Sequence, residues 1–271
     1  MPHSIGKLKP ITDARQIRLD DAAAAAPDDL PHGDDLDRAL KHERKRLEKL
    51  QSALYADGRY ALLVVLQGRD ASGKDGTVRK VFRSVNPMGC EVTSFKVPTE
   101  AELAHDFLWR IHQRVPARRI IGIFNRSHYE DVIVPRVRKS LPKKVWSARY
   151  EQINDFERML VESSVAILKF FLHVSRDEQK NRLEERLEDE KKNWKFRLGD
   201  LDDRALWDDY TSAYRDAIAK CSSASSPWYI VPADDEDARD LLIGRTIADT
   251  LDGLDLRYPP LDPELKGLKI K

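Results

Sequence analysis

A run of apolar, β-forming residues leads directly into a glycine-rich turn, and this junction constrains the fold more than any other part of the chain. Residues 62–66 read Leu-Leu-Val-Val-Leu, a continuous apolar run that is typical of a strand buried on both faces of a sheet. Gly68 and the pair Gly73-Lys74 follow with the G-x-x-x-x-G-K spacing of a Walker A loop. The sequence therefore predicts a strand, a phosphate-binding loop and then a helix.

The residue types in this loop suit an anion. Glycines let backbone N–H groups turn inward around a phosphate, and the positive end of the following helix points at the same place. Lys74 adds a mobile positive charge for the phosphate that is transferred. A merely structural glycine turn is the alternative, but the position between a buried strand and a helix disfavours it. The residues that we expect to contact phosphate, besides Lys74, are Gly68, Arg69, Ala71, Ser72, Gly73, Asp75 and Gly76.

Two carboxylates make this loop unusual. Asp75 stands where a Walker A loop normally carries the magnesium-binding Ser or Thr, and Asp70 lies inside the loop. A carboxylate beside a polyanion is repelled unless a divalent cation lies between the two charges. We therefore expect Asp70 to bind Mg²⁺, with Mn²⁺ as an alternative ion. For Asp75, a charge that simply favours the start of a helix is an equally good explanation.

Composition narrows the class of protein. A chain of 271 residues with 41% hydrophobic content can bury a full core, and its net charge of +1 does not indicate a nucleic-acid-binding protein. Cys90 and Cys221 are the only cysteines, which suits a reducing compartment. The sequence has neither an 18-residue apolar run nor an N-terminal signal pattern. We expect a soluble, cytoplasmic protein that binds neither nucleic acid nor membrane.

Hydrophobic periodicity predicts alternating strands and helices. The expected strands are 61–67, 91–97, 119–125, 165–174 and 228–232, and the expected helices are 35–56, 74–85, 99–114, 129–136, 143–163, 176–190, 204–220 and 235–251. This alternation indicates an α/β fold, with a parallel sheet between two layers of helices and a ligand site at the carboxyl ends of its strands. One domain over residues 35–255 suffices. Residues 1–34 form an irregular arm that either wraps over the core or stays mobile, and residues 256–271 form an irregular tail.

The end of the third predicted strand adds polar groups to the same edge. Asn125 stands where a Walker B strand normally ends in Asp, and Arg126 beside it can stabilise charge on a transferring phosphoryl group. Glu130 and Asp131 lie one helical turn further on and are expected to complete a metal or acceptor site. The alternative is a helix cap, because Ser127 and Glu130 have the spacing of a capping box.

Basic residues extend the predicted site. Lys80 and Arg83 follow the phosphate loop on its helix and would turn one phosphate pocket into a channel for a longer polyanion. Residues 182–203 combine basic and aromatic side chains as mobile kinase lids do, and we expect Arg182 or Arg186 to reach the phosphates. A charged helix that faces solvent is the alternative for this segment.

Several motifs that fall in order resemble the polyphosphate kinase 2 family over residues 35–255. They are Gly-Arg-Asp-Ala-Ser-Gly-Lys-Asp-Gly (68–76), Ser-Phe-Lys-Val-Pro-Thr (94–99), Phe-Leu-Trp-Arg (107–110), Phe-Asn-Arg-Ser-His-Tyr-Glu-Asp (124–131), Trp-Lys-Phe (194–196) and Trp-Asp-Asp-Tyr (207–210). The resemblance implies a three-layer P-loop kinase fold similar to thymidylate kinase, with a five-stranded parallel sheet and a helical lid. It also implies magnesium-dependent phosphoryl transfer between inorganic polyphosphate and nucleotides.

The resemblance assigns roles to matching positions. Asp70 would bind the metal, Lys74 would be the loop lysine, Arg126 a phosphate clamp and Arg186 a lid arginine, with Arg182 as a second lid arginine. It further implies a homo-oligomer, either a dimer or a tetramer.

The chain departs from the common family pattern at two places. Asn125 replaces an Asp, which argues against a charged metal ligand there, and His128-Tyr129-Glu130 replaces Trp-Tyr-Asn. This version resembles the subgroup that phosphorylates both AMP and ADP, so polyphosphate, AMP, ADP and ATP are the expected ligands. Two other functions remain open: an ATP-dependent nucleoside monophosphate kinase, and a non-enzymatic polyanion- or nucleotide-binding regulator. The regulator is disfavoured because passive binding gains nothing from the Asp70 carboxylate.

Overall fold

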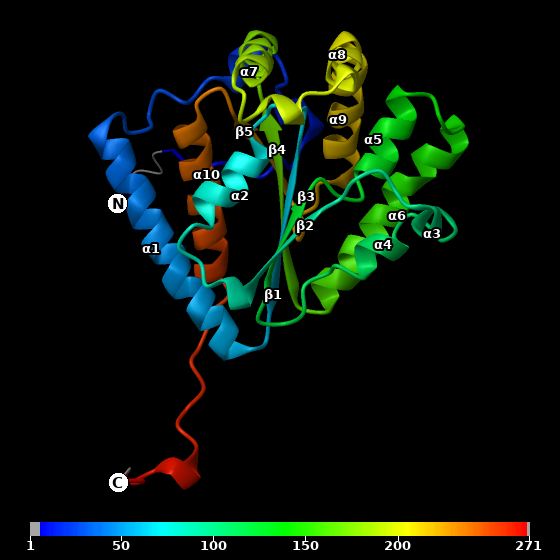
Figure 1. The fold of residues 1–271 in the computed structure, drawn as a ribbon. Coiled ribbons are helices and arrows are strands. Elements are labelled where there is room, and N and C mark those ends of the chain that lie inside the picture. The colour runs from blue at the N-terminus through cyan, green and yellow to red at the C-terminus, as the bar shows by residue number, and fades with distance from the viewer. Residues whose placement is uncertain (1–5, 270–271) are drawn as a thin grey trace.

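The computed structural model describes residues 6–269 and places a five-stranded parallel sheet between two layers of helices (Figure 1). The strands are β1 (Ala61–Gly68), β2 (Cys90–Ser94), β3 (Ile121–Asn125), β4 (Val165–His173) and β5 (Trp228–Pro232). They lie in the order β2-β3-β1-β4-β5, and every neighbouring pair is parallel. The predicted α/β fold with a five-stranded parallel sheet is confirmed.

Alternate residues of β1 enter two separate cores, because successive side chains of a strand point to opposite faces. The helices are α1 (Asp34–Asp57), α2 (Lys74–Val81), α3 (Glu100–Leu103), α4 (Trp109–His112), α5 (Glu130–Val137), α6 (Lys143–Glu162), α7 (Arg176–Glu188), α8 (Leu198–Ala205), α9 (Trp207–Cys221) and α10 (Glu236–Asp252). Leu63 and Val65 pack under α5, α6 and α9, whereas Leu62 and Val64 pack under α1, α2 and α10. Among the described residues, no helix combines the length and apolar character needed to span a bilayer.

The region after β2 differs from the sequence prediction. Thr99 and Glu102 form a capping box, but the helix that it starts ends at Leu103 instead of continuing to residue 114 as predicted. Asp106 interrupts it, because its carboxylate accepts a hydrogen bond from the Leu108 N–H and starts a new turn before α4. β2 also ends three residues early, and the Lys96 carbonyl beyond it accepts a hydrogen bond from Arg110.

Two more predicted helices have different bounds. α2 ends at Val81 rather than at residue 85, and the helix predicted over 204–220 is divided at Leu206 into α8 and α9. α8 therefore begins inside the predicted lid segment, residues 182–203. Figure 1 shows α7 and α8 side by side above the carboxyl ends of the strands.

Residues 6–33 lie against the domain. Ile11, Ile17 and Leu19 are buried in the same core as α9, and the Ile11 N–H donates to the Trp228 carbonyl of β5. His173 at the end of β4 contacts the Asp20 carbonyl through Nε2 at 2.8 Å. The arm thus covers the β4–β5 side of the sheet. The C-terminal segment leaves the domain below α1 and α10 and is exposed from residue 257 to residue 269 (Figure 1).

Candidate functional site

The phosphate loop, residues 68–76, joins β1 to α2 at the carboxyl edge of the sheet. Its backbone turns require unusual geometry: φ is +154° at Gly68, +62° at Ala71 and +95° at Gly73. At Gly73 a side chain is excluded for a second reason, because a Cβ there would overlap Nη1 of Arg239. Glycine at this position therefore satisfies both the left-handed backbone and the close approach of a buried arginine.

Lys74 begins α2 and is buried beneath the loop. Its Nζ donates to the carbonyls of Gly68 at 2.8 Å and Arg69 at 2.9 Å. Burial lowers the pKa of Lys74 to about 8, and the nearby charge of Arg126 adds to this effect. The ammonium group of Lys74 therefore loses its proton closer to neutral pH than that of an ordinary lysine.

This pKa predicts a pH dependence for the binding of a polyanion. As pH rises through about 8, Lys74 of the free protein loses its charge, so kcat/KM for a polyanionic donor should fall. Bound phosphates favour the ammonium form, so kcat should stay constant to higher pH. The measurement is a pair of pH–rate profiles for the wild type and for Lys74→Arg, whose guanidinium stays charged. A wild-type kcat/KM that stays level well above pH 8 would contradict the assignment.

Arg126 connects the loop to the segment that follows β3. One of its terminal nitrogens forms an ion pair with Asp70, and the other lies 3.0 Å from Glu130 Oε2. The negative charge of Glu130, opposed in part by burial, raises the pKa of Arg126 further above its ordinary value. Its φ of +64° is strained for a residue with a side chain. The three predicted residues therefore meet at the mouth of the loop.

Glu130 binds Arg126 instead of capping a helix. No side chain caps α5, whose first residue is Glu130, so the alternative of a Ser127–Glu130 capping box is wrong. The arginine is a charged partner, and it competes successfully with the backbone N–H that a capping box would require.

Asn125 and Asp75 also meet across the site. Asn125 Nδ2 donates to Asp75 Oδ1 at 2.7 Å, and Lys195 Nζ lies 3.5 Å from the other carboxylate oxygen. Burial opposes ionisation of Asp75, but the Asn125 hydrogen bond and the Lys195 charge outweigh it and lower the pKa. Asn125 therefore acts as a neutral donor to a carboxylate, in keeping with the loss of the usual Asp.

The predicted lid segment, residues 182–203, contacts the loop through two basic residues, Arg182 and Lys195. Arg186 lies 3.5 Å from Asp200 of α8, so its ion pair holds α7 and α8 together. Arg182 donates to the carbonyls of Ala71 in the loop and of Ala233 and Asp234 after β5. In this arrangement Arg182 supports the loop from the side of α7, and its contact with phosphate stays a prediction.

Four other predicted residues lie outside the contacts between Asp70, Arg126 and Glu130. Three of them have other partners, and the fourth is exposed. Lys80 forms ion pairs with Glu236 at 2.9 Å and Asp237 at 3.2 Å on α10, because these carboxylates face α2. Asp131 is paired with Arg110, and burial raises its pKa. Arg69 stacks on the ring of Trp207, with 3.8 Å from its guanidinium carbon to the ring centroid. Arg83 is exposed and forms no hydrogen bond or ion pair with any described residue.

Arg239 and Asp240 were not anticipated from the sequence. Both are buried on α10, and Asp240 accepts hydrogen bonds from Thr77 of α2 and from Arg239. Together with the overlap at Gly73, these contacts brace the floor of the loop. The only local signal was Gly73 itself, which indicated a close approach but not the residue that makes it.

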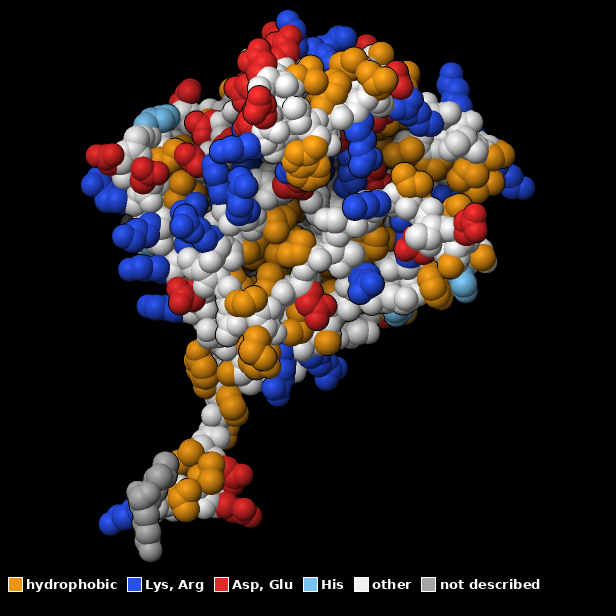
Figure 2. Space-filling model, in the orientation of Figure 1, with side chains coloured by type: hydrophobic (Ala, Val, Ile, Leu, Met, Phe, Trp, Pro, Cys, Tyr) orange, Lys and Arg blue, Asp and Glu red, His pale blue; other side chains and the backbone are white. Residues whose placement is uncertain are grey.

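The donor atoms at this site suit a hard cation. Asp70, Asp75 and Glu130 offer carboxylate oxygens near the loop, although within residues 6–269 no three acidic, His or Cys side chains form a metal-binding cluster. Mg²⁺ commonly binds through one or two carboxylates together with substrate phosphates, so the residues fit this ion. In Figure 2, basic side chains border a recess beneath the lid on this face of the molecule.

Comparisons with known proteins identify the family of the chain. Residues 32–258 match the family model described as Polyphosphate kinase 2 (PPK2). An AMP/ADP-polyphosphate phosphotransferase of Meiothermus ruber is 54% identical over 232 residues, which cover 86% of each chain. An ADP-polyphosphate phosphotransferase of Rhodopseudomonas palustris is 43% identical over 236 residues, which cover 83% of this chain and 82% of the relative.

A solved structure agrees as well. The polyphosphate kinase 2 from Arthrobacter aurescens TC1 superposes with a TM-score of 0.87 at 37% identity, covering 95% of each chain. Fold and sequence matches of this extent lead to one conclusion: the chain belongs to the polyphosphate kinase 2 family.

Proposed function

We propose that this protein transfers phosphoryl groups between inorganic polyphosphate and adenine nucleotides, converting AMP to ADP and ADP to ATP. The observation that carries this proposal is the meeting of Arg126 with Asp70 and Glu130 at the mouth of the phosphate loop. Family membership supports it, as do the names of two relatives, which describe transfer between polyphosphate and AMP or ADP. In the forward direction, a phosphate oxygen of the nucleotide forms a bond to the terminal phosphorus, and the bond to the shortened polyphosphate breaks.

The residues of the site would act mainly by position and charge. Lys74 and the loop N–H groups hold one set of phosphates, and Arg126 leaves Asp70 to bind the phosphoryl group in transfer. Arg186 reaches the phosphates from the lid, and Glu130 and Asn125 lie on the side of the nucleotide acceptor. Magnesium, when bound at Asp70, would neutralise charge on the phosphates.

The organisation of the chain fits the same proposal. Residues 35–255 form the phosphotransferase domain, which includes a lid over 182–203, and the arm and tail flank it. The free cysteines Cys90 and Cys221 support a reducing, cytoplasmic location. We also propose that the enzyme works as a homo-oligomer, either a dimer or a tetramer, as the resemblance implies.

A donor exchange tests the function. Purified protein is incubated with AMP and magnesium together with polyphosphate, with ATP or with neither donor, and products are separated by chromatography. We expect ADP formation with polyphosphate only. Transfer from ATP alone would favour an ordinary nucleoside monophosphate kinase, and binding without transfer from either donor would favour a regulator.

Arg83 tests the path of the polymer. Because it is exposed on the stretch after α2 and unpaired among the described residues, we expect Arg83→Ala to raise KM for long polyphosphate more than KM for AMP, and less so at high salt. Lys49→Ala on the exposed surface of α1 is the matched control and should change neither value. Lys80→Ala should act more weakly on KM, since Lys80 is held by Glu236 and Asp237. Equal losses for AMP and polyphosphate in Arg83→Ala would contradict a channel.

A further inference from the structure

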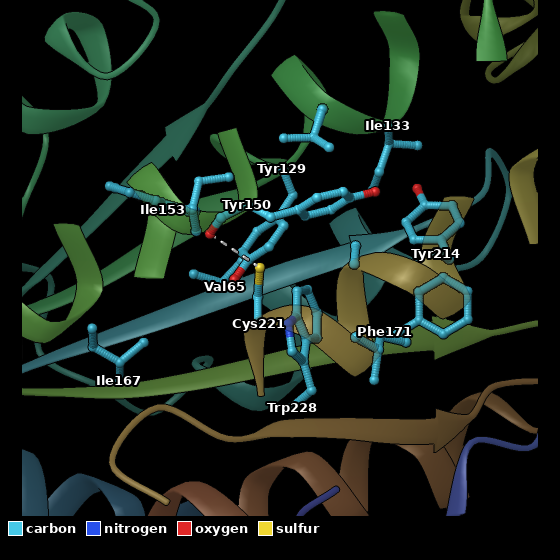
Figure 3. Packing of buried hydrophobic residues seen from close by; sticks show 14 of the residues in the cluster. Val65, Tyr129, Ile133, Tyr150, Ile153, Ile167, Phe171, Tyr214, Cys221 and Trp228 are labelled. Carbon is cyan, nitrogen blue, oxygen red and sulfur yellow. Dashed lines mark hydrogen bonds between the residues drawn. The ribbon is translucent and has the colours of Figure 1, made fainter. Parts of the chain in front are cut away.

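A lysine occupies a core position of the sheet where its neighbours along the strand are apolar. Lys169 lies on β4 between Ile167 and Phe171, points to the same face as these residues and is fully buried. It pairs in register with Val65 of β1 and Trp228 of β5. Figure 3 shows Val65, Ile167, Phe171 and Trp228 around this part of the core. A charge at such a position needs a specific partner, because burial of an unpaired ammonium is costly.

Its partner is a second buried charge, Glu157 of α6. Lys169 Nζ forms an ion pair with Glu157 Oε2 and also donates to the Cys221 carbonyl at 2.6 Å and to Tyr129 Oη at 3.2 Å. Burial opposes ionisation of Glu157, but the charge of Lys169 and contact with His128 lower its pKa to about 2. Glu157 is therefore ionised at neutral pH.

The other oxygen of Glu157 binds the segment that carries the site. Glu157 Oε1 accepts from the Tyr129 hydroxyl at 2.9 Å and lies 3.2 Å from His128 Nε2. His128 Nδ1 has no partner among residues 6–269, so the ring contacts Glu157 through Nε2 alone. We define the buried charge network as Lys169, Glu157, Tyr129 and His128.

These contacts fall between two residues of the candidate site. Within the Arg126 segment, residues 125–130, the central residues Ser127, His128 and Tyr129 are fully buried, whereas Arg126 and Glu130 at either side meet in an ion pair at the loop. Arg126 also has a strained backbone, with φ at +64°, which persists only when surrounding contacts fix it. The buried charge network supplies such contacts from α6 and β4.

We propose that the buried charge network is a positioning device that fixes Arg126 and Glu130 for phosphoryl transfer. An apolar pair of similar volume would fill this core without the desolvation cost of two charges, so packing alone does not account for it. The ion pair holds the Glu157 carboxylate in one orientation. Glu157 can then contact His128 and Tyr129 only when the Arg126 segment has one particular conformation. The kinetic test of this proposal rests on the proposed function. The hydrogen-exchange test does not.

The kinetic test uses the double variant Lys169→Met with Glu157→Gln, which keeps volume and removes both charges. Because Arg126 would act from a looser position, we expect kcat to fall about tenfold and KM for polyphosphate to stay within about twofold. In an Arg126→Lys background, the same two substitutions should lower kcat by less than about twofold. The reason is that substitutions that act through the same group do not have additive effects. Rates are measured well below the melting temperature of each variant.

Two variants keep the test decisive. Leu168→Ala, the buried neighbour of Lys169 that faces the other core, should lower the melting temperature without lowering kcat. Tyr129→Phe removes one hydroxyl and keeps the ring, so it serves if the double variant does not fold, and it should lower kcat in the same non-additive way. A wild-type kcat in the folded variants, or equal losses in the wild-type and Arg126→Lys backgrounds, would overturn the positioning role.

Hydrogen exchange provides a readout that needs no activity. We expect amides of residues 125–130 to exchange faster in the double variant than in the wild type, with β1 unchanged, and we expect no such local change in Leu168→Ala. Unchanged exchange in this segment would overturn the proposal even if the variants lost activity. An inactive wild type with faster exchange in the double variant would instead overturn the proposed function and leave the positioning of the segment supported.

Discussion

Asp70→Asn is expected to lower kcat by about 10²- to 10³-fold while leaving the melting temperature close to that of the wild type. The substitution keeps the shape of the side chain but removes the charge that would bind the metal beside the phosphates. The fold should tolerate it, because Asp70 lies in a partly exposed loop and Glu130 remains as a partner for Arg126. Steady-state rates over a range of magnesium concentrations, together with a thermal melt, measure both effects.

Asp75→Asn is the matched control for this experiment. Asp75 is also a loop carboxylate, but it is bound by Asn125 and Lys195, and we expect a much smaller loss of kcat. The Asp70 variant should also need more magnesium to reach half of its maximal rate. Near wild-type turnover of Asp70→Asn at saturating magnesium would contradict the metal role.

Arg126→Gly is expected to lower kcat by about 10³-fold with little loss of stability. Glycine adopts the observed φ of +64° without strain, so the backbone can stay in place while the guanidinium that would clamp the phosphoryl group is lost. The relief of backbone strain offsets part of the lost ion pairs with Asp70 and Glu130. Single-turnover rates and a melt of the same preparation provide the two measurements.

Arg126→Lys separates charge from geometry at this position. Lysine keeps a positive charge but cannot bind two partners through a planar fork. We expect its kcat to lie between those of the wild type and Arg126→Gly. If all three proteins turned over equally fast, Arg126 would have no part in transfer.

The phosphate loop and the alternation of strands and helices were predictable because they depend on contiguous patterns. The apolar run before Gly68, the glycine spacing and Lys74 lie within a few residues of one another, and parallel strands joined by helices leave few topologies. From these patterns the carboxyl edge of the sheet could be identified as the site. In the structure, β1 pairs directly with β3, and this pairing brings Asn125 to the loop.

Contacts between distant segments were not predictable. Arg239 of α10 fills the space at Gly73, and Trp207 of α9 stacks on Arg69, but neither residue carries a local signal of its partner. A local pattern was also misleading where a tertiary contact was formed instead. The Ser127–Glu130 spacing suggested a helix cap, but in the structure Glu130 forms an ion pair with Arg126. Such choices depend on which charges the folded chain brings together.

A time course with AMP, excess polyphosphate and magnesium decides whether this enzyme phosphorylates acceptors of two lengths. Asn125 ends β3 and Glu130 begins α5, so the carboxylate lies about one helical turn beyond the strand end. A metal held there would be placed differently between donor and acceptor, and we expect it to allow both AMP and ADP as acceptors. We predict that ADP appears first and is then converted to ATP in the same vessel, with no ATP added. ADP that accumulates without ATP, or AMP that stays inert while ADP reacts, would contradict this assignment.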